Sequence, residues 1–264
     1  MARVLITGCS TGFGRAAAVE LTKRGHDVVA TARRLSALDD LDVADRIALD
    51  VDDDVSVAAA LAASGPVDAL VNNAGFGVNG PIECVPIERA KQLFETNVWG
   101  AVRMMQAVVP AMRERGRGVI VNVSSVAGRV ATPLGGFYAG SKFALEGISE
   151  AAHIELGHFG IRIHLVEPGF FETSFSDNAS GFGVDGPPYD ELAAMWTNVD
   201  SKLLGGARPG PEVVAAAIAD AVERDDTPLR VPVGADAELV IATRAQLDDA
   251  AFEATMRATL GFTW

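Results

Sequence analysis

The chain has 264 residues, enough for one large domain or at most two small ones. Apolar residues make up 49% and charged residues 22%, ordinary values for a globular protein that argue against intrinsic disorder. With 22 Lys and Arg against 35 Asp and Glu, the net charge is −13. This charge disfavours nucleic acids and anionic membrane surfaces as partners, because like charges repel.

Neither the cysteines nor the N-terminus indicates a secreted or metal-binding protein. Cys9 and Cys84 cannot build a disulfide scaffold, and no Cys/His grouping has metal-ligand spacing, so we expect no metal site. The first residues lack the core of a signal peptide, and no apolar run approaches the ~20 residues of a membrane helix. We therefore expect a cytoplasmic protein without membrane insertion.

Short runs of β-branched residues alternate with Ala-rich stretches from the first residues onward. They predict strands at 4–6, 27–32, 47–50, 69–72, 119–123, 161–167 and 229–233, with helices at 14–24, 55–63, 86–115, 137–156 and 211–224. Apolar strands separated by helices predict an α/β fold with a doubly wound parallel sheet. We expect one domain over residues 1–264, with a lid at about 174–211 before the last strand and a helical tail at about 235–264.

A glycine-rich turn directly follows the first predicted strand and opens a helix. In it, Gly8 permits a tight turn, Gly12 lets the backbone approach a pyrophosphate, and Gly14 lets the helix pack on the strand. The helix N-terminus offers unpaired N–H groups to an anion. The residues that we predict to bind a dinucleotide here are Gly8, Ser10, Thr11, Gly12, Phe13 and Gly14. A glycine-rich turn without a ligand is the alternative.

Cofactor preference is usually decided at the end of the second strand. Folds that bind NAD place a carboxylate there for the ribose 2′-hydroxyl, whereas this chain has Ala32 followed by Arg33 and Arg34. A guanidinium is a planar, permanently charged fork that suits a 2′-phosphate. We predict that Arg33 and Arg34 favour NADP(H) over NAD. The alternative is a pair of solvated arginines.

Tyr138 and Lys142 stand one turn apart at the start of a predicted helix and share one face. A free tyrosine has a pKa of about 10, and a neighbouring ammonium favours the phenolate and lowers that pKa. Ser125 follows the predicted strand 119–123, so its hydroxyl lies at the carboxyl end of a strand. Alone, Tyr and Lys at this spacing are usually a surface pair, but with the glycine turn and the serine they predict a catalytic site.

The predicted helix 86–115 is apolar on two faces. One stripe consists of Ala90, Leu93, Asn97, Ala101, Met104 and Val108, and the other of Ile87, Phe94, Val98, Val102, Met105, Val109 and Met112. Both faces must be buried, one on the sheet and one elsewhere. The helix 137–156 has a small apolar outer stripe at Phe143, Gly147 and Ile154. We hypothesise that the chain forms a homodimer or homotetramer through these two helices.

Together these motifs resemble the short-chain dehydrogenase/reductase family, in the branch with a TGxxxGxG turn and a YxxxK pair. The match runs from residue 3 to about residue 173 and more loosely to the last strand. Besides the residues above, it includes Asp50, Val51, Asn72, Asn73, Ala74, Gly75, Asn97, Pro168, Gly169 and Thr173. The resemblance implies a Rossmann fold and an oxidoreductase that interconverts a secondary alcohol and a carbonyl compound. Short stretches are similar to the steroid- and retinol-dehydrogenase-like branch.

The resemblance also implies a role for each matched residue. Tyr138 would exchange a proton with the substrate oxygen, to which Ser125 would hydrogen-bond. Lys142 would hold the nicotinamide ribose and lower the pKa of Tyr138, while Asn97 would anchor a water that relays protons to Lys142. The other implied cofactor contacts are Asp50 and Val51 at the adenine, Asn73, Ala74 and Gly75 on the adenosine side, and Pro168, Gly169, Phe171 and Thr173 at the carboxamide.

Structural and functional alternatives remain open at this stage. Asn72 and Asn73 fit strand-end caps, Asp50 a turn residue, Thr173 a helix N-cap and Asn97 a satisfied polar group inside a helix. A nicotinamide-dependent epimerase or dehydratase also uses YxxxK, but usually with a GxxGxxG turn and a longer sugar-nucleotide domain. A non-catalytic NADP-binding regulatory protein is expected to lose the tyrosine or the lysine, and this chain has both.

The segment around the predicted lid is rich in large apolar side chains. They are Phe170, Phe171, Phe175, Phe182, Tyr189, Met195 and Trp196. Few Lys or Arg residues stand among them to clamp an anion, which favours a lipophilic alcohol or carbonyl substrate. Glycines and prolines in the same segment favour a mobile cover. The alternative is that these side chains are ordinary core.

Overall fold

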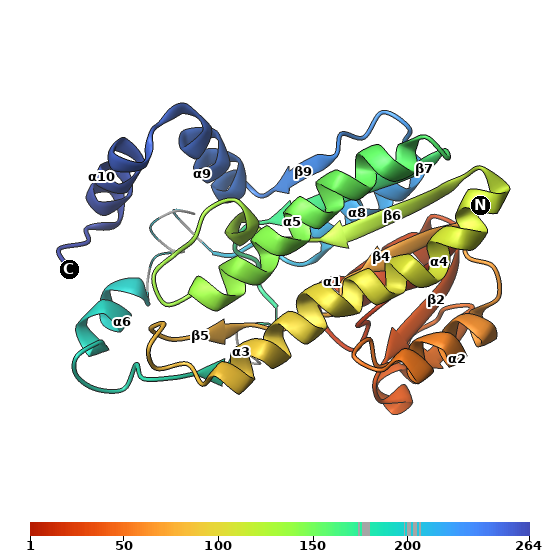
Figure 1. The fold of residues 1–264 in the computed structure, drawn as a ribbon, viewed down its shortest axis with the longest axis horizontal. Helices are drawn as coiled ribbons and strands as arrows, with labels where there is room; N and C mark the ends of the chain where they lie inside the picture. Colours follow the sequence, from red (N-terminus) through yellow and green to blue (C-terminus); the bar gives the residue numbers. More distant parts are fainter. Residues whose placement is uncertain (174, 176–179, 198, 200–201, 203–204, 206) are drawn as a thin grey trace.

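A single parallel sheet dominates the computed structural model, which describes residues 1–264 except 174, 176–179, 198, 200–201, 203–204 and 206 (Figure 1). Its strands are β1 (Arg3–Ile6), β2 (Asp27–Ala32), β3 (Asp45–Ala48), β4 (Ala69–Asn72), β6 (Gly118–Val123), β7 (Ile161–Pro168) and β9 (Arg230–Val233). Their order is β3–β2–β1–β4–β6–β7–β9. The strand order reverses at β1, which pairs with both β2 and β4. Doubly wound sheets bind their ligands at such a switch point.

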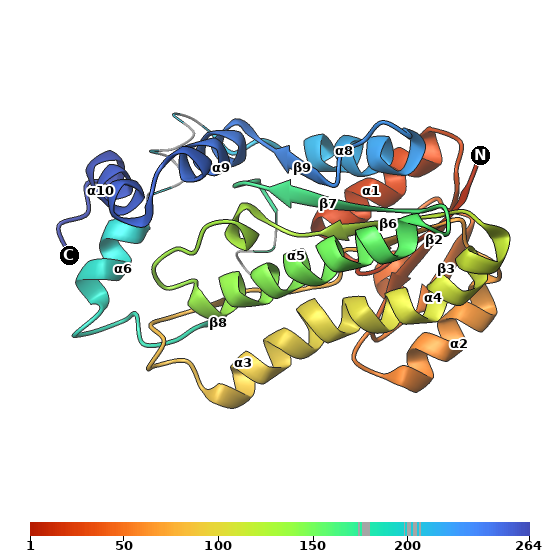
Figure 2. The same cartoon turned by 45° about the horizontal axis from the view of Figure 1, so that its top comes forward.

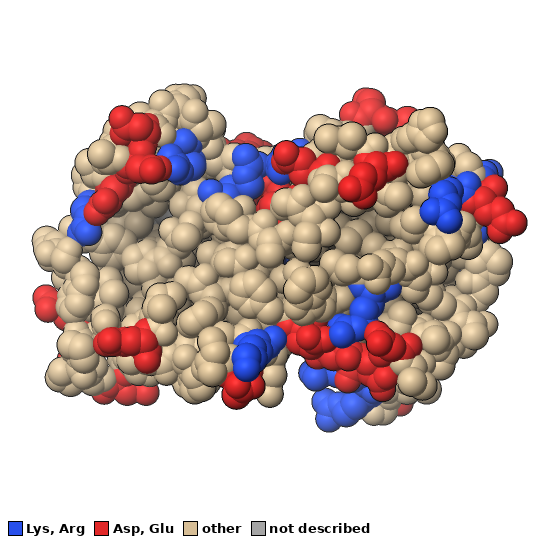
Figure 3. Space-filling view, in the orientation of Figure 1, with Lys and Arg blue, Asp and Glu red and all other residues tan. Residues whose placement is uncertain are grey.

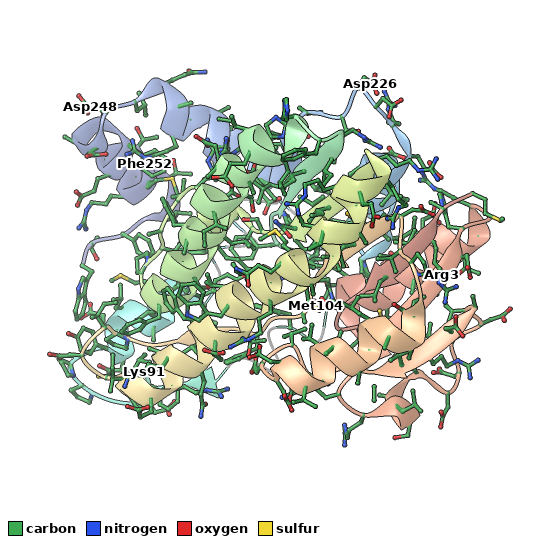
Figure 4. All side chains as sticks on the ribbon, turned by 45° about the vertical axis from the view of Figure 1, so that its right-hand side comes forward. Arg3, Lys91, Met104, Asp226, Asp248 and Phe252 are labelled. Carbon is green, nitrogen blue, oxygen red and sulfur yellow. The ribbon has the colours of Figure 1, made fainter. Side chains whose placement is uncertain are left out.

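Helices cover both faces of the sheet, because apolar parallel strands leave neither face free for water. One face carries α1 (Gly12–Lys23) and α8 (Glu212–Glu223), and the other carries α2 (Asp54–Ser64), α4 (Ala101–Arg115) and α5 (Gly136–Gly157) (Figure 2). Each face of the sheet has its own apolar core. Val4 of β1 packs in the core beneath α1 and α8, and the next residue, Leu5, packs in the core on the other face with Met104 of α4 (Figure 4). The predicted doubly wound parallel sheet is confirmed.

The chain ends in two helices at one end of the molecule. They are α9 (Ala235–Gln246) and α10 (Asp249–Leu260) (Figure 1), and the residues that follow α10 contact α6 (Asp190–Trp196). Trp196 stacks on Phe262 with ring centroids 5.7 Å apart. A small parallel pair of strands, β5 (Val78–Asn79) and β8 (Ser180–Gly181), joins the region after β4 to the predicted lid. Several lid residues lie outside the described part of the chain. No helix within the described part is long and apolar enough to cross a membrane.

The predicted helix 86–115 is found as one unbroken helical run, but it is not α-helical throughout. α3 (Ile87–Phe94) passes into a π-helical turn, Glu95–Gly100, before α4 begins. A π turn holds more residues than an α turn, so it shifts the direction of the side chains that follow. Met105 and Met112 were predicted on a different stripe from Met104, but all three are buried in one core.

The third strand lies two positions before its predicted place at 47–50. β3 spans Asp45–Ala48 and is an edge strand, where polar residues are common. The apolar pattern that predicts a buried strand therefore does not include the polar residues Asp45 and Arg46. The pairing ends with β2 at Ala32, and beyond it the backbone N–H of Asp50 donates to the Ser56 hydroxyl at 2.9 Å.

Candidate active site

Four loops that carry predicted site residues follow four neighbouring strands, β1, β4, β6 and β7. The strands pair in parallel, with Ile6 opposite Val71 and Val123 opposite Val166. The carboxyl ends of parallel strands share one edge of a sheet. This edge therefore brings together the glycine turn, residues 73–75, Ser125 and residues 168–173.

The glycine turn needs glycine at three positions for different reasons. Gly8 and Gly12 have φ angles of +74° and +60°, which side-chain-bearing residues rarely adopt. A Cβ at Gly14 would lie 2.3 Å from Asn73 Nδ2 and 2.6 Å from the Gly8 carbonyl oxygen. Thr11, the N-cap of α1, makes no side-chain capping bond, so the first N–H groups of α1 face no cap of their own. This arrangement fits the pyrophosphate of a dinucleotide.

Thr7 and Asn73 hold this turn against the end of β4. Asn73 Nδ2 donates to the carbonyl oxygens of Thr7 and Gly8 at 2.9 and 3.0 Å. The Thr7 hydroxyl oxygen lies 3.0 Å from the backbone N–H groups of Asn73 and Ala74, which donate to it. The side chain of Asn73 is thus engaged with the turn, and any cofactor contact that it makes stays a prediction. Sequence analysis missed Thr7 although it opens the motif.

Arg33 and Arg34 directly follow β2, and both are exposed. Within the part of the chain that the structure describes, neither guanidinium has a hydrogen-bond or ion-pair partner. Ser10 and Thr11 are exposed on the glycine turn after the adjacent strand, β1. Two exposed guanidinium groups near the glycine turn would suit a further phosphate group.

The remaining predicted adenosine contacts lie in the loops after β3 and β4. The Asp50 carboxylate accepts the backbone N–H of Asp52 at 3.1 Å, and Val51 is buried in the core. Gly75 is exposed, and a Cβ on it would lie 3.0 Å from Asn97 Oδ1. These contacts hold the loops in place, and the contacts predicted for Asp50, Val51, Ala74 and Gly75 with the adenosine stay predictions.

Ser125, Tyr138 and Lys142 come together from β6 and α5. Ser125 Oγ accepts the Ala127 N–H at 3.1 Å and donates to the Pro168 carbonyl at 3.5 Å. Lys142 Nζ donates to the Val123 carbonyl at 2.8 Å and lies 5.8 Å from the centroid of the Tyr138 ring. The lysine is buried although it is a cation, so its charge depends on these few neighbours.

The pKa values of the two α5 groups differ from the sequence-based expectation. Burial raises the pKa of Tyr138 to about 12, and the hydrogen bond with Ser125 offsets only part of that shift. Burial lowers the pKa of Lys142 to about 8, against the opposing charge of Glu146. The predicted lowering of the tyrosine pKa by Lys142 is therefore not met, because desolvation of the phenolate dominates.

Asn97 lies in the π-helical turn and is buried. Its Oδ1 accepts the Phe76 N–H at 3.0 Å, while Nδ2 donates to the Phe76 carbonyl at 3.0 Å and to Ser141 Oγ at 3.2 Å. Ser141 in turn donates to the Tyr138 carbonyl at 2.7 Å. Asn97 is thus linked to α5 through Ser141. Ser141 was not among the predicted site residues, although it stands inside the YxxxK segment.

Residues 168–173 run from the end of β7 toward the glycine turn. A Cβ at Gly12 would lie 3.8 Å from Thr173 Cβ. Phe171 is buried and meets Phe13 edge-on, with ring centroids 5.7 Å apart. The side chains of Phe13 and Phe171 are therefore core, and any contact of Phe171 with a cofactor is left to its backbone.

A buried ion cluster that the motifs did not reveal joins α5 and β7. Glu167 of β7 is fully buried, and Glu146 of α5 is 4% exposed. Arg129 donates to Glu167 at 3.0 Å, and Arg230 donates to Glu146 at 2.9 Å and also binds Glu150. In the described part of the chain, one oxygen of each buried carboxylate has no partner. Burial and the neighbouring Glu146 charge raise the pKa of Glu167 above its usual range.

We expect Glu167→Gln to gain stability relative to the wild type as the pH rises from about 5 to about 8. The unfolded chain releases this proton near pH 4.3, whereas folded Glu167, with its raised pKa, still holds it. The contribution of Glu167 to stability is therefore present at low pH and lost as the pH rises through the folded-state pKa. Glutamine stays neutral throughout.

Denaturant unfolding at the two pH values measures this difference. Glu155→Gln is the control, because Glu155 is an exposed glutamate on α5, the helix that carries Glu146. A stability difference between Glu167→Gln and wild type that does not change with pH would contradict the prediction.

The doubly wound sheet, the glycine turn at its switch point and the Ser125–Tyr138–Lys142 group define a class of protein, the nicotinamide-dependent α/β oxidoreductases. Comparison with known proteins narrows this class. The family model for short chain dehydrogenases matches residues 2–181. The chain belongs to this family, and it is an oxidoreductase.

Curated relatives match almost the whole chain. The 3-ketodihydrosphingosine reductase of Bacteroides thetaiotaomicron is 36% identical over 246 residues, which cover 90% of each chain. Retinol dehydrogenase 8 of Homo sapiens is 38% identical over 247 residues, 86% of this chain and 79% of the relative.

Solved structures agree with this family assignment. A short-chain dehydrogenase from Streptomyces avermitilis has a TM-score of 0.83 at 38% identity, covering 99% of this chain and 97% of that one. One from Burkholderia cenocepacia in complex with NADP has a TM-score of 0.79 at 28% identity and covers 97% of each chain. A 3-ketoacyl-(acyl-carrier-protein) reductase from Brucella melitensis complexed with NADH has a TM-score of 0.76 at 26% identity, covering 87% of this chain and 95% of that one. These neighbours support a nicotinamide cofactor, and they include complexes with both NADP and NADH.

Proposed function

We propose that the protein is an NADP(H)-dependent oxidoreductase that interconverts a secondary alcohol and a carbonyl on a lipophilic substrate. The observation that carries the proposal is the position of Ser125, Tyr138 and Lys142 at the same sheet edge as the glycine turn. Carbonyl reduction needs a proton donor next to the dinucleotide site, because the hydride adds to the carbon and the proton to the oxygen of the same C=O bond.

The chain's own residues supply binding, orientation and the proton. The nicotinamide, when bound, carries the hydride. Tyr138 has a pKa of about 12, so its phenol holds a proton at neutral pH and can give it to the substrate oxygen during reduction. Ser125 would hold that oxygen by a hydrogen bond, and Lys142 would favour the resulting phenolate by its charge. In oxidation, the proton returns to Tyr138.

Support for NADP(H) comes from the end of β2. Arg33 and Arg34 are exposed there, and a carboxylate that would hold the ribose 2′-hydroxyl of NAD is absent from this short segment. Gly8, Gly12, Gly14 and the uncapped start of α1 would hold the pyrophosphate. Pro168, Gly169, Phe171 and Thr173 would hold the carboxamide through their backbone and the threonine hydroxyl.

Support for a lipophilic substrate comes from the surroundings of Tyr138. Phe175 lies with its ring centroid 5.5 Å from that of Tyr138. An apolar cluster built on Val78 and Leu93 packs against Tyr138, Phe76 and Phe182. Two relatives are named for 3-ketodihydrosphingosine and for retinol, which are both lipophilic.

Consumption of NADPH with a panel of ketones and aldehydes tests the proposal. The panel pairs each long-chain carbonyl compound with a short carboxylated one, and turnover is expected to favour the long-chain member. Net oxidation of NADPH supports an oxidoreductase of this specificity. Product formed without net cofactor change would instead show an epimerase or dehydratase, and binding without turnover would show a regulatory protein.

We infer that the chain forms a homo-oligomer through the face of α4 and α5. Trp99 of the π-helical turn before α4 is 49% exposed, and Phe143 and Ile154 of α5 are 46% and 76% exposed. A band with few charged side chains crosses α4 and α5 (Figure 3). Such exposed apolar surface is typical of protein interfaces.

The double substitution Phe143→Glu with Ile154→Glu is expected to reduce the mass measured by light scattering to that of a monomer, whereas Leu239→Glu on α9 is expected to leave that mass unchanged. A monomeric wild type would overturn the inference.

A further inference from the structure

Asp236 is a buried acidic residue in the first turn of α9, beyond the part of the chain that the family model matches. It lies against two glycines that follow β7 and β9. A Cβ at Gly169 would be 2.2 Å from Asp236 Oδ2, and a Cβ at Gly234 would be 2.7 Å from Oδ1. The carboxylate has room here only because both neighbours lack a side chain.

The carboxylate holds one backbone N–H of the loop after β7. Phe170 N–H donates to Asp236 Oδ2 at 2.7 Å. Its other oxygen, Oδ1, has no partner within the described residues. A buried carboxylate that is only half satisfied costs stability. Because Asp236 costs stability at this position, we infer that it serves a function other than stabilising the fold.

The peptide groups next to Phe170 show which way the hydrogen bond to Asp236 turns the backbone. Gly169 N–H donates to the Val233 carbonyl at 3.0 Å, while the Pro168 carbonyl accepts from the Ser125 hydroxyl at 3.5 Å. The Pro168 carbonyl and the Gly169 N–H belong to one trans peptide, in which the N–H and the C=O point in opposite directions. By the same rule the Gly169 carbonyl points away from Asp236, because it shares a peptide plane with the Phe170 N–H.

We propose that Asp236 is a positioning residue, which fixes the Gly169–Phe170 peptide so that the Gly169 carbonyl faces the carboxamide of the bound dinucleotide. This inference rests on the proposed function, in which residues 168–173 bind that carboxamide. An anionic acceptor holds an N–H group more firmly than a neutral one, and the N-terminus of α9 favours the negative charge. The tail helix α9 thereby takes part in the cofactor site.

Binding measurements on the full chain test the proposal. Asp236→Ala is expected to weaken NADPH binding about tenfold, because the Phe170 N–H loses its acceptor. The fragment 2′,5′-ADP has no nicotinamide and is expected to bind Asp236→Ala as it binds the wild type. Asp236→Asn keeps an acceptor oxygen and is expected to stay within about threefold of the wild-type affinity for NADPH.

Asp248→Ala is the matched control. Asp248 caps the other tail helix, α10, and accepts the Ala251 N–H at 2.8 Å, at the outer edge of the molecule (Figure 4). Its loss is expected to leave both affinities unchanged. A general loosening of the tail would weaken binding in both variants, whereas a positioning role affects Asp236→Ala alone.

A measurement without cofactor tests the contact itself. Gly169→Ala would place a methyl group where the carboxylate lies, so it is expected to lower the melting temperature strongly in the wild-type background. In the Asp236→Ala background the space is vacated, and the same substitution is expected to cost much less.

The outcomes separate this inference from the proposed function. A wild type that binds neither NADPH nor NADH would overturn both. A wild type that binds NADPH, with an Asp236→Ala variant that binds it equally well, would overturn the inference alone. So would a Gly169→Ala effect that does not depend on residue 236.

Discussion

Tyr138→Phe is expected to lower kcat for carbonyl reduction by about 1000-fold or more while leaving dinucleotide binding unchanged. The substitution removes only the hydroxyl that would give its proton to the substrate oxygen. The ring keeps its contact with Phe175, 5.5 Å away between centroids, so the shape of the site is retained. Steady-state NADPH oxidation measures kcat, and nucleotide fluorescence measures binding.

The chain offers a matched control, because its second tyrosine is Tyr189. That phenol donates to Glu83 at 2.9 Å, away from Ser125 and Lys142. Tyr189→Phe is expected to change kcat by less than about twofold, as is usual for a hydroxyl outside the chemistry. Turnover retained in Tyr138→Phe would refute the acid–base role of Tyr138 and leave the proposed mechanism without its proton donor.

Replacing Arg33 and Arg34 together by serine is expected to lower the preference for NADPH over NADH by about 100-fold, since each lost charge-assisted contact is worth about tenfold or more. We expect the change mainly as a higher KM for NADPH, because the 2′-phosphate is remote from the reacting atoms. The measurement is the ratio of kcat/KM for the two cofactors.

Lys23→Ser is the control for the loss of positive charge. Lys23 is exposed at the opposite end of α1 from the glycine turn, so the cofactor preference is expected to stay as in the wild type. A wild-type enzyme that already prefers NADH would show that Arg33 and Arg34 are solvated arginines and not a phosphate site.

The features that were predictable from the sequence depend on local rules. Positive φ angles at Gly8 and Gly12 are a property of single residues, and the spacing of Tyr138 and Lys142 on one helical face follows from helix geometry. The parallel sheet followed from apolar strands between helices, because a strand buried on both sides must be covered on both sides. Edge strand β3 and the π-helical turn escaped this pattern, since polar edge residues and an irregular turn carry no clear periodicity.

Other features depend on residues that are distant in the chain and meet only in the folded state. The engagement of Asn73 with the glycine turn, the Glu146–Glu167 cluster and the bond from Phe170 to Asp236 join separate strands and helices. Burial likewise decided the pKa values of Tyr138 and Lys142, because desolvation depends on everything that packs around a group. The sequence thus determined the fold, the family and the chemical groups at the site. Only the tertiary structure decided which backbone groups the side chains of Asn73 and Asp236 bind and what pKa values Tyr138 and Lys142 have. Both depend on packing between distant elements, which no local sequence pattern records.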